Sequence, residues 1–424
     1  MCSNICFKYR IYPTQGQAKT LQSQLDFCRF LYNNALEHRR LAFKAGKSKE
    51  ATVFTQCKQI AGMTSSSEFP EAAGIRFSNL QAVLRRLDCS FQNFFRRVRK
   101  GEKPGFPRFC PKHANSESML FPVSNFGIGK GDTGGIKLLP VSLKSTSKKS
   151  RQLQIYGVSG TVLVKLHREI EGKPKNVSLK RQGSKWFVVV CCEDVPKPAQ
   201  AVTSKQIGID LGVNVFAVDS DGANYPSPKP WKTAKEKIAH LSRQLARKQK
   251  GSNNRKKAKS ALSKAHEHVA NVREDHQHKL SAKLVKENSL IVVEDLSIQR
   301  MLSTKGEGKH QQALHSNISD SAWFAFRQKL EYKAARAGIQ VVAVNPRDTS
   351  RTCSSCMQVK KKLALSERTF YCSACGSTMD RDANAARNIL RLGLSLVGAP
   401  SAPCVKAKKA ASLPSKLKRK AEEH

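Results

Sequence analysis

The sequence lacks any apolar run long enough to span a membrane, although its 424 residues suffice for two or three domains with cores of their own. Its first residues, from Met1 to Cys6, also lack the basic-then-apolar pattern of a secretory signal. We therefore expect an intracellular, cytoplasmic protein with no membrane partner.

Acidic residues are scarce in this chain. Asp and Glu number 32 against 75 Lys and Arg, which gives a formal net charge of +43 spread over the whole length. A folded chain this cationic repels itself, so a polyanionic partner is expected. No long basic amphipathic helix with a broad apolar face is evident, and this favours nucleic acid over a membrane surface. In a prokaryote the protein would then be associated with the nucleoid.

The first half of the chain mixes strand and helix periodicities. Apolar residues that alternate with basic ones predict strands in 1–13 and in 114–198, including a hairpin over 176–192. Between them, apolar residues at helical spacing predict two helices, the second over 78–99. The simplest account is a β domain made of 1–13 and 114–198, interrupted by a helical insert at 14–113.

The second half alternates strands with helices, which favours an α/β sheet layer. The strands are predicted at 206–210, 215–219, 289–293 and 339–344. One of the helices is predicted over 319–337 and ends before Gly338. The last segment, 396–424, is basic and poor in apolar residues, so we expect it to be disordered.

Thirteen cysteines are present, and most stand alone, as buried thiols do in a reducing compartment. Four of them form two C-x-x-C pairs fifteen residues apart: Cys353, Cys356, Cys372 and Cys375. Two such pairs can close one tetrahedral thiolate site around zinc. With no open fourth position implied, this zinc would be structural. Two unrelated pairs, or a redox pair, are the alternatives, and the turn-rich surroundings disfavour the latter.

Three carboxylates lie at the ends of apolar strands or at the start of a helix. Asp210 and Glu294 each follow a strand, and Asp382 precedes a helix. Taken singly, Asp210 is explained by a turn cap and Asp382 by a helix N-cap. Glu294 is harder to explain by stability, because burying it unpaired is costly. Strand alternation allows only one of Glu294 and Asp295 to face the side of Val292, and we favour Glu294.

Together these carboxylates define a site that can bind two divalent cations, Mg²⁺ or Mn²⁺. One cation would activate water and the other would stabilise the leaving oxygen of a phosphodiester. In a cationic chain that binds nucleic acid, this combination is typical of a nuclease.

Five motifs in this order resemble the TnpB (OrfB) family of transposon-associated proteins, which are relatives of the type V CRISPR effectors. The motifs are Gly208-Ile209-Asp210-Leu211-Gly212, Arg273-Glu274-Asp275-His276-Gln277-His278-Lys279, Val293-Glu294-Asp295-Leu296, Thr349-Ser350-Arg351-Thr352-Cys353 and Asp380-Arg381-Asp382-Ala383-Asn384-Ala385-Ala386. The resemblance extends from Phe7 to about Leu392. One departure is Met357, which stands after the first cysteine pair where the family usually has glycine.

The resemblance implies a multidomain α/β fold. An RNase H-like (RuvC) nuclease domain would comprise 199–350 and 378–395, with a zinc-finger insert at 351–377. A wedge-type β-barrel would precede it, with 14–113 as its inserted helical recognition region. By position, Asp210, Glu294 and Asp382 match the catalytic triad, and Asp380 is the alternative to Asp382.

The function that the resemblance implies is RNA-guided, metal-dependent DNA cleavage. A guide RNA from the protein's own element would pair with double-stranded DNA beside a short transposon-adjacent motif. Two other functions remain as alternatives. A nuclease-silent, guide-dependent repressor would be expected to lack one of the three carboxylates. The other is a transposase or accessory protein acting in DNA transposition. A transposase using a covalent tyrosine would want a His-apolar-His pair, whereas His266-Glu267-His268 and His276-Gln277-His278 have polar middle residues. A metal-assisted transposase would use the same three carboxylates on the same kind of sheet.

Overall fold

The computed structural model describes residues 3–65, 68–111, 116–122, 126, 134–139, 150–196, 203–303, 308–364 and 366–398. Of the segment predicted to be a disordered tail, 399–424 lies outside the described residues. The chain forms two compact units, Met1–Gln200 with Pro230–Glu274, and Ala201–Lys229 with Asp275–His424. Residues 230–274 thus pack with the first unit, whereas the sequence analysis counts them in 199–350. The predicted domain boundaries stay predictions.

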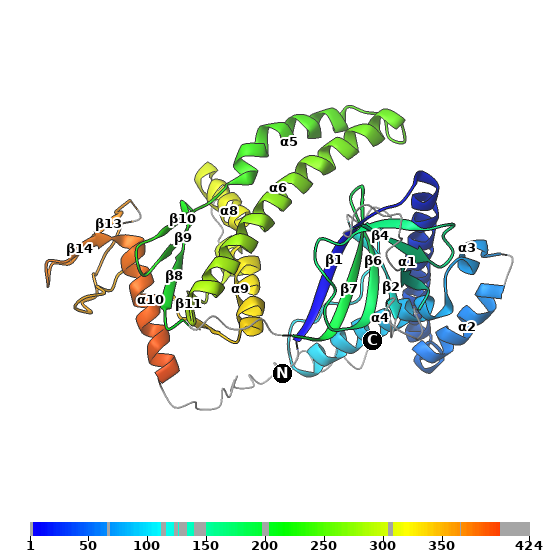
Figure 1. The fold of residues 1–424 in the computed structure, drawn as a ribbon, viewed down its shortest axis with the longest axis horizontal. Helices are drawn as coiled ribbons and strands as arrows, with labels where there is room; N and C mark the ends of the chain where they lie inside the picture. Colours follow the sequence, from blue (N-terminus) through cyan, green and yellow to red (C-terminus); the bar gives the residue numbers. More distant parts are fainter. Residues whose placement is uncertain are drawn as a thin grey trace. The chain divides into compact units, whose positions relative to one another are not determined.

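The first unit contains a seven-stranded antiparallel sheet that curls into a nearly closed barrel (Figure 1). In sheet order its strands are β2 (Ser116–Pro122), β6 (Lys173–Gln182), β7 (Lys185–Val195), β1 (Ser3–Tyr12), β5 (Val162–Lys165), β4 (Ser150–Ile155) and β3 (Ile136–Leu138). In β1, Phe7, Tyr9 and Ile11 are buried, while Lys8 and Arg10 lie on the opposite face. The alternation expected from the sequence is therefore present, and it puts one face of the strand in the core.

The helices between β1 and β2 pack on the inner face of this sheet and share its core. They are α1 (Gln15–Lys44), the short η1 (Ser48–Glu50), α2 (Val53–Ser65), α3 (Pro70–Ala73) and α4 (Phe77–Arg99). Thr14 begins α1 with a capping box, in which its side chain and that of Gln17 bond each other's backbone amide. The same unit holds α5 (Pro230–Ala246) and the first part of α6 (Asn253–Glu287).

The second unit contains a mixed five-stranded sheet between helices (Figure 1). Its order is β10 (Asn224–Pro226), β9 (Val215–Asp219), β8 (Gln206–Leu211), β11 (Leu290–Glu294) and β12 (Gln340–Val344). The last three strands are parallel to one another, and β8, β9 and β10 are antiparallel. On one face the end of α6 packs with α8 (Lys309–Ser321) and α9 (Trp323–Ala337), and α7 (Ile298–Ser303) lies beside them. On the other face lies α10 (Arg381–Gly398).

The helix predicted over 319–337 is wrong at its start. The helix is interrupted at Ala322, which has a left-handed φ of 49°, so that α8 ends and α9 begins there. The buried Gln277 side chain of α6 donates to the carbonyls of Ser321 and Ala322. This satisfies backbone groups that a continuous helix would have bonded internally. The predicted end at Gly338 is confirmed, with φ 76° at the helix cap.

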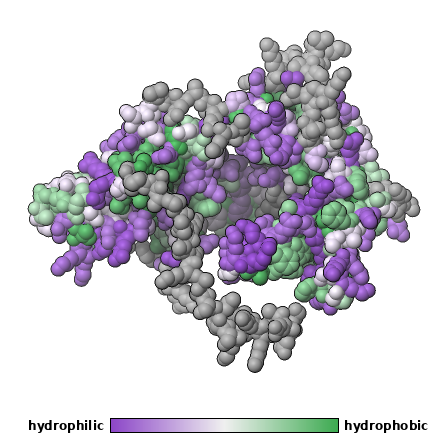
Figure 2. Space-filling model, turned by 90° about the horizontal axis from the view of Figure 1, so that it is seen from below, coloured by the Kyte–Doolittle hydropathy of each residue, from purple (hydrophilic) through white to green (hydrophobic). Residues whose placement is uncertain are grey.

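Hydrophilic side chains cover much of the face drawn in Figure 2, in agreement with the large positive charge. None of the helices in the described residues combines the length and apolar content needed to cross a bilayer.

The segment that precedes α10 contains a small two-stranded ribbon, β13 (Thr369–Tyr371) with β14 (Thr378–Asp380). It also contains two matching turns. In the first turn the amide of Met357 donates to the carbonyl of Cys353, and in the second the amide of Gly376 donates to that of Cys372. Met357 and Gly376 have nearly equal φ values, 69° and 74°. The methionine therefore adopts a conformation that suits glycine.

The Met357→Gly variant should stabilise the first turn by about 1 kcal/mol, because it removes left-handed strain while Met357 is already partly exposed. Hydrogen exchange of the Cys353 amide, which donates to the Gln358 carbonyl, should slow roughly fivefold. The reciprocal change, Gly376→Met, should speed exchange of the Cys372 amide. Equal exchange at Cys353 in both proteins would show that Met357 carries no strain.

Candidate functional site

Helix α10 lies directly on the backbone of β8. A Cβ atom at Gly208 would come within 2.2 Å of the Ala386 carbonyl oxygen and 2.6 Å of the Leu390 nitrogen. Gly208 thus faces α10, and so does Val292 of the neighbouring strand, which packs with Ile389. Only a residue without a side chain fits at 208, which explains the glycine of the first motif.

Because side chains alternate along a strand, the two carboxylates face the same side as Gly208 and Val292. Asp210 is two residues beyond Gly208, and Glu294 is two beyond Val292, so both belong to the α10 face. The parallel strands β8 and β11 pair Gly208 with Val292, and the same register continued places Asp210 beside Glu294. Both residues end their strands at the same edge of the sheet. The structure therefore brings together two residues that are 84 apart in sequence.

Glu294 is the inward residue of its pair, as alternation predicts. It is 8% exposed, and its carboxylate accepts a hydrogen bond of 2.6 Å from the Thr349 hydroxyl. Asp295 is exposed and pairs instead with Arg327. Burial raises the pKa of Glu294, and the Thr349 bond opposes that rise.

Asp382 reaches the same region from the first turn of α10. Burial, followed by the nearby Glu294 and Asp382 charges, raises the pKa of Asp210 to about 8. Burial and then the charge of Asp380 raise the pKa of Asp382. Asp210 therefore lies close enough to Glu294 and Asp382 to interact with both charges. In the described part of the chain they do not form a cluster with all ligand atoms within 4.8 Å, whereas the cysteines below do.

The two aspartates of the last motif have different surroundings. Asp380 is exposed, and its Oδ1 accepts from the backbone amides of Asp382 and Ala383 at 2.9 Å each. Asp380 is therefore the N-cap of α10. Asp382 is half-buried and is not the cap, so the ordinary explanation for an aspartate at this place does not apply to it.

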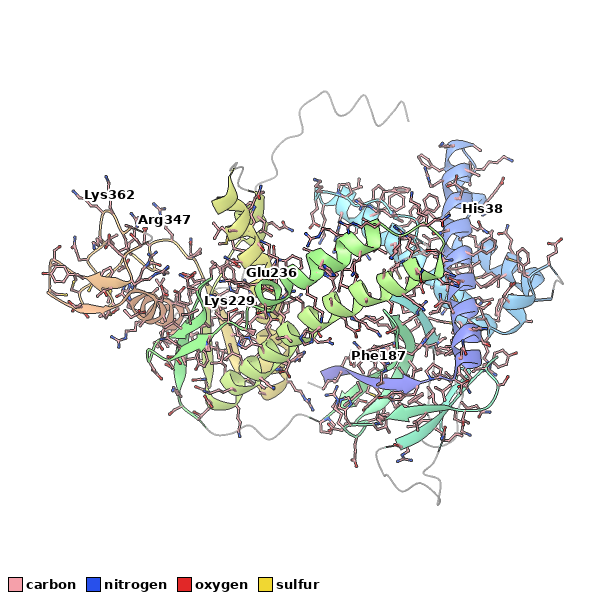
Figure 3. All side chains as sticks on the ribbon, turned by 90° about the horizontal axis from the view of Figure 1, so that it is seen from above. His38, Phe187, Lys229, Glu236, Arg347 and Lys362 are labelled. Carbon is pink, nitrogen blue, oxygen red and sulfur yellow. The ribbon has the colours of Figure 1, made fainter. Side chains whose placement is uncertain are left out.

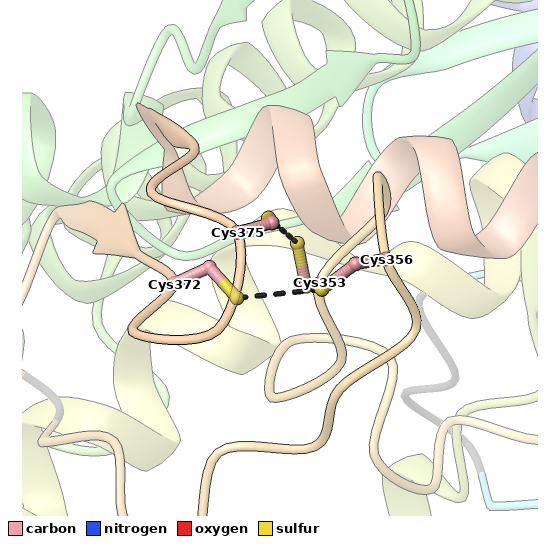
Figure 4. Close-up of side chains that lie close together, drawn as sticks. All are labelled: Cys353, Cys356, Cys372 and Cys375. Atoms are coloured by element: carbon pink, nitrogen blue, oxygen red, sulfur yellow. Dashed lines mark hydrogen bonds between the residues drawn. The ribbon is translucent and has the colours of Figure 1, made fainter.

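The four cysteines converge on one point (Figure 4). The Sγ atoms of Cys353 and Cys375 are 3.7 Å apart, and those of Cys356 and Cys372 are 3.5 Å apart. A tetrahedron with Zn–S bonds of about 2.3 Å has edges of about 3.8 Å, so this spacing fits zinc. The Ser377 hydroxyl lowers the pKa of Cys375 to about 6, which favours the thiolate form that binds metal.

Two asparagines of α10 connect the cysteine cluster with Glu294. The buried Asn388 side chain donates to the carbonyls of Thr349 and Thr352, at 2.9 and 2.7 Å. The buried Asn384 also donates to Thr352 and accepts from the amide of Ser354, next to Cys353. The segment that holds Glu294 through Thr349 therefore leads directly into the first cysteine pair.

Thr349 and Asn384 lie within sequence motifs but have no predicted role, and Asn388 lies outside the motifs. The spacing of Asn384 and Asn388, four apart on a helix beside a carboxylate, was the available signal. Their partners are backbone carbonyls, which a sequence pattern does not reveal. Arg347 and Lys362 are exposed around the same segment, where Figure 3 labels them.

The histidine pairs do not form a metal site. In the second pair the middle residue, Gln277, is buried, His276 packs edge-on against Phe216, and His278 is exposed. In the first pair His266 stacks on Trp231. Within the second pair, the two imidazoles therefore have different surroundings.

Three family profiles match the chain. The OrfB profile, described as "Probable transposase", matches residues 189–305, "Cas12f1-like, TNB domain" matches 323–389, and "Helix-turn-helix domain" matches 1–48. In the structure the described part of 1–48 forms the strand β1 and the long helix α1 rather than two short helices.

Relatives cover nearly the whole chain. A Streptomyces pristinaespiralis protein named "Putative RNA-guided DNA endonuclease" is 33% identical, over 92% of this chain and 89% of its own. The Escherichia coli K12 protein named "Putative RNA-guided DNA endonuclease InsQ" is 29% identical, over 91% and 92%.

Among solved structures, one titled "Cryo-EM structure of the Cas12f1-sgRNA-target DNA complex" superposes with a TM-score of 0.51 at 15% identity, over 92% of this chain and 98% of that one. This likeness shows a multidomain α/β fold of the Cas12 type. Since the OrfB profile spans Asp210 and Glu294 and a relative is one-third identical over almost the full length, the chain belongs to the TnpB (OrfB) family.

Proposed function

We propose that this protein is an RNA-guided DNA endonuclease of a transposable element, which cuts double-stranded DNA beside a short transposon-adjacent motif. The names of its relatives support the activity, and the net charge of +43 suits a chain that holds both a guide RNA and target DNA. The observation that carries the proposal is the placement of Asp210, Glu294 and Asp382 around one end of the mixed sheet.

We assign these three residues as ligands of Mg²⁺ or Mn²⁺, and Asp382 rather than Asp380 as the third. Burial, followed by repulsion from Glu294 and Asp382, raises the pKa of Asp210 to about 8, and this supports a donor set that lacks its counter-ion. Asp210, Glu294 and Asp382 would hold these cations, whose chemistry would be to polarise a water and to neutralise charge on the leaving oxygen. In this arrangement Thr349 holds the Glu294 carboxylate, and Asp380 fixes the start of the helix that carries Asp382.

The finer domain assignment follows from the same elements. The mixed sheet with helices on both faces supports an RNase H-like (RuvC) domain, and the four cysteines support a zinc finger inserted before α10. The barrel sheet supports the wedge-type domain, with α1 to α4 as its helical recognition region. Zinc held by Cys353, Cys356, Cys372 and Cys375 would be structural, because the four thiolates fill a tetrahedral shell.

A silent repressor is less well supported than a nuclease, because all three carboxylates are present and Asp210 interacts with the charges of the other two. A transposase using a covalent tyrosine is less well supported because the histidine pairs do not converge.

The Asp210→Asn variant should lose DNA cleavage by at least about a thousandfold, because an amide is a poor ligand for a hard divalent cation. Guide RNA and target DNA binding should change less than about threefold. The measurement is single-turnover cleavage of a guide-matched duplex, with binding measured in parallel. The control is Asp275→Asn, which removes an exposed aspartate paired with Lys279 on α6. Cleavage at the normal rate in the Asp210 variant would refute the assignment.

The same variant should also unfold later than the natural protein when no divalent cation is added. It removes a carboxyl group whose pKa is raised, first by burial and then by the Glu294 and Asp382 charges. The cost of placing that group in the fold is thereby relieved, by on the order of 1 kcal/mol. Added Mg²⁺ should then stabilise the natural protein but not the variant, because binding to the folded state alone raises stability. Urea unfolding with and without Mg²⁺ measures both effects. A variant that is less stable without Mg²⁺ would mean that Asp210 serves the fold and not a cation.

The Asn388→Leu variant should slow cleavage at saturating guide and DNA by about tenfold, with little change in binding. Leucine keeps the branching of the side chain but leaves the Thr349 carbonyl without this donor and the Thr352 carbonyl with Asn384 alone, so the Thr349 hydroxyl no longer fixes Glu294. The matched control is Asn224→Leu, at an exposed position on β10. Equal loss of binding and cleavage would indicate general unfolding instead of a positioning role.

A further inference from the structure

Helix α4 continues past the core that it helps to build. Its first turns bury Leu80, Val83, Leu84 and Leu87, and Phe91 is the last residue packed against that core. Beyond Phe91 the apolar side chains of α4 are half-buried, as Phe94 is, or exposed, as Phe95 and Val98 are. In the following segment up to residue 111, Pro107 is buried and Cys110 packs against the core, while the other side chains are exposed.

Four aromatic rings gather at this end of the helix. We call Phe91, Phe94, Phe95 and Phe106 the phenylalanine cluster; their ring centroids are 5.2 to 6.4 Å apart, mostly in edge-to-face pairs. Phe95 is 54% exposed and Phe106 is 47% exposed. The rings hold one another in place and still present faces to solvent, so little order has to be gained on binding.

Basic residues flank these rings in the sequence, with almost no acidic residue among them. Between residues 94 and 111 the exposed basic side chains are Arg96, Arg97, Arg99, Lys100, Lys103 and Arg108. The same stretch contains one acidic residue, Glu102. Among the described residues none of the six has an ion-pair partner, although Arg96 bonds the Asn93 side chain. Such a surface complements a polyanion with flat apolar groups.

We propose that the phenylalanine cluster binds single-stranded RNA, with unpaired bases stacked on Phe95 and Phe106 and phosphates held by the flanking basic residues. Stacking of this kind requires bases that are not already paired, so duplex DNA cannot use the rings. A protein partner fits less well, because six cations against one acidic residue would require a densely acidic protein surface to balance them. The inference rests on the proposed function in one respect: the guide is the RNA that the protein carries.

The test uses the full chain and a labelled oligouridine of about 12 nucleotides, a length typical of single-strand sites. The assay contains salt at about 0.3 M, which weakens the binding that depends on charge alone and leaves the contribution of stacking. The double variant Phe95→Leu with Phe106→Leu keeps apolar packing but removes the aromatic faces, and it should bind the RNA at least tenfold more weakly. Binding of a duplex DNA of the same length should change less than twofold.

Two further variants keep the result interpretable. Phe43→Leu with Phe54→Leu replaces exposed phenylalanines of the same unit outside the cluster, and it should bind RNA normally. Arg97→Gln with Arg99→Gln leaves the rings intact and should weaken RNA binding and reduce its salt dependence. No cleavage step enters the assay, so failure of the nuclease assignment would leave it unaffected. Unchanged RNA affinity in the phenylalanine variant, or tighter binding of oligothymidine than of oligouridine, would overturn the proposal.

Discussion

The contact on which the candidate site depends is the one between α10 and the bare backbone of β8. Gly208 allows a carbonyl and an amide of the helix to approach the strand more closely than any side chain would permit. Gly393 makes a similar approach, because a Cβ there would lie within 2.3 Å of Val292. These two contacts seat the helix on the sheet, and its first turn thereby brings Asp382 to the edge where β8 and β11 end. Packing of the helix on the sheet, and not a bond between the side chains, thus brings the three carboxylates to the same edge of the sheet.

The charges around Asp210 distinguish it from most other carboxylates of the chain. In a chain with more than twice as many basic as acidic residues, most carboxylates can find a cation on a neighbouring side chain, as Asp295 does with Arg327. Asp210 has no such ion pair among the described residues, and its strongest electrostatic neighbours carry the same charge. Arg381 lowers the pKa of Asp210, but burial and the Glu294 and Asp382 charges outweigh it, so the raised pKa of Asp210 reflects a site short of positive charge.

Much of this arrangement could be predicted from the sequence, because it follows from local periodicity. The alternation in β11 identified Glu294 as the inward residue, and the cysteine spacing identified the thiolate cluster. The break at Ala322 could not be predicted, since it depends on Gln277, a residue 45 positions earlier in the chain. Asn388 was missed for the same reason: its importance comes from carbonyls that tertiary packing brings to it. The choice between Asp380 and Asp382 depended on where α10 begins, and sequence patterns locate helix ends only to within a few residues.

The capping bond of Asp380 has a consequence for comparing this chain with its relatives. Asparagine and serine begin helices about as well as aspartate does, so a relative with either residue at the first aspartate of the motif can retain a working cleavage centre. Asp382 does not cap the helix, so a neutral residue in its place has no capping function to take over. Under the proposed assignment of Asp382 as a metal ligand, a neutral residue at this second position should abolish cutting and leave binding.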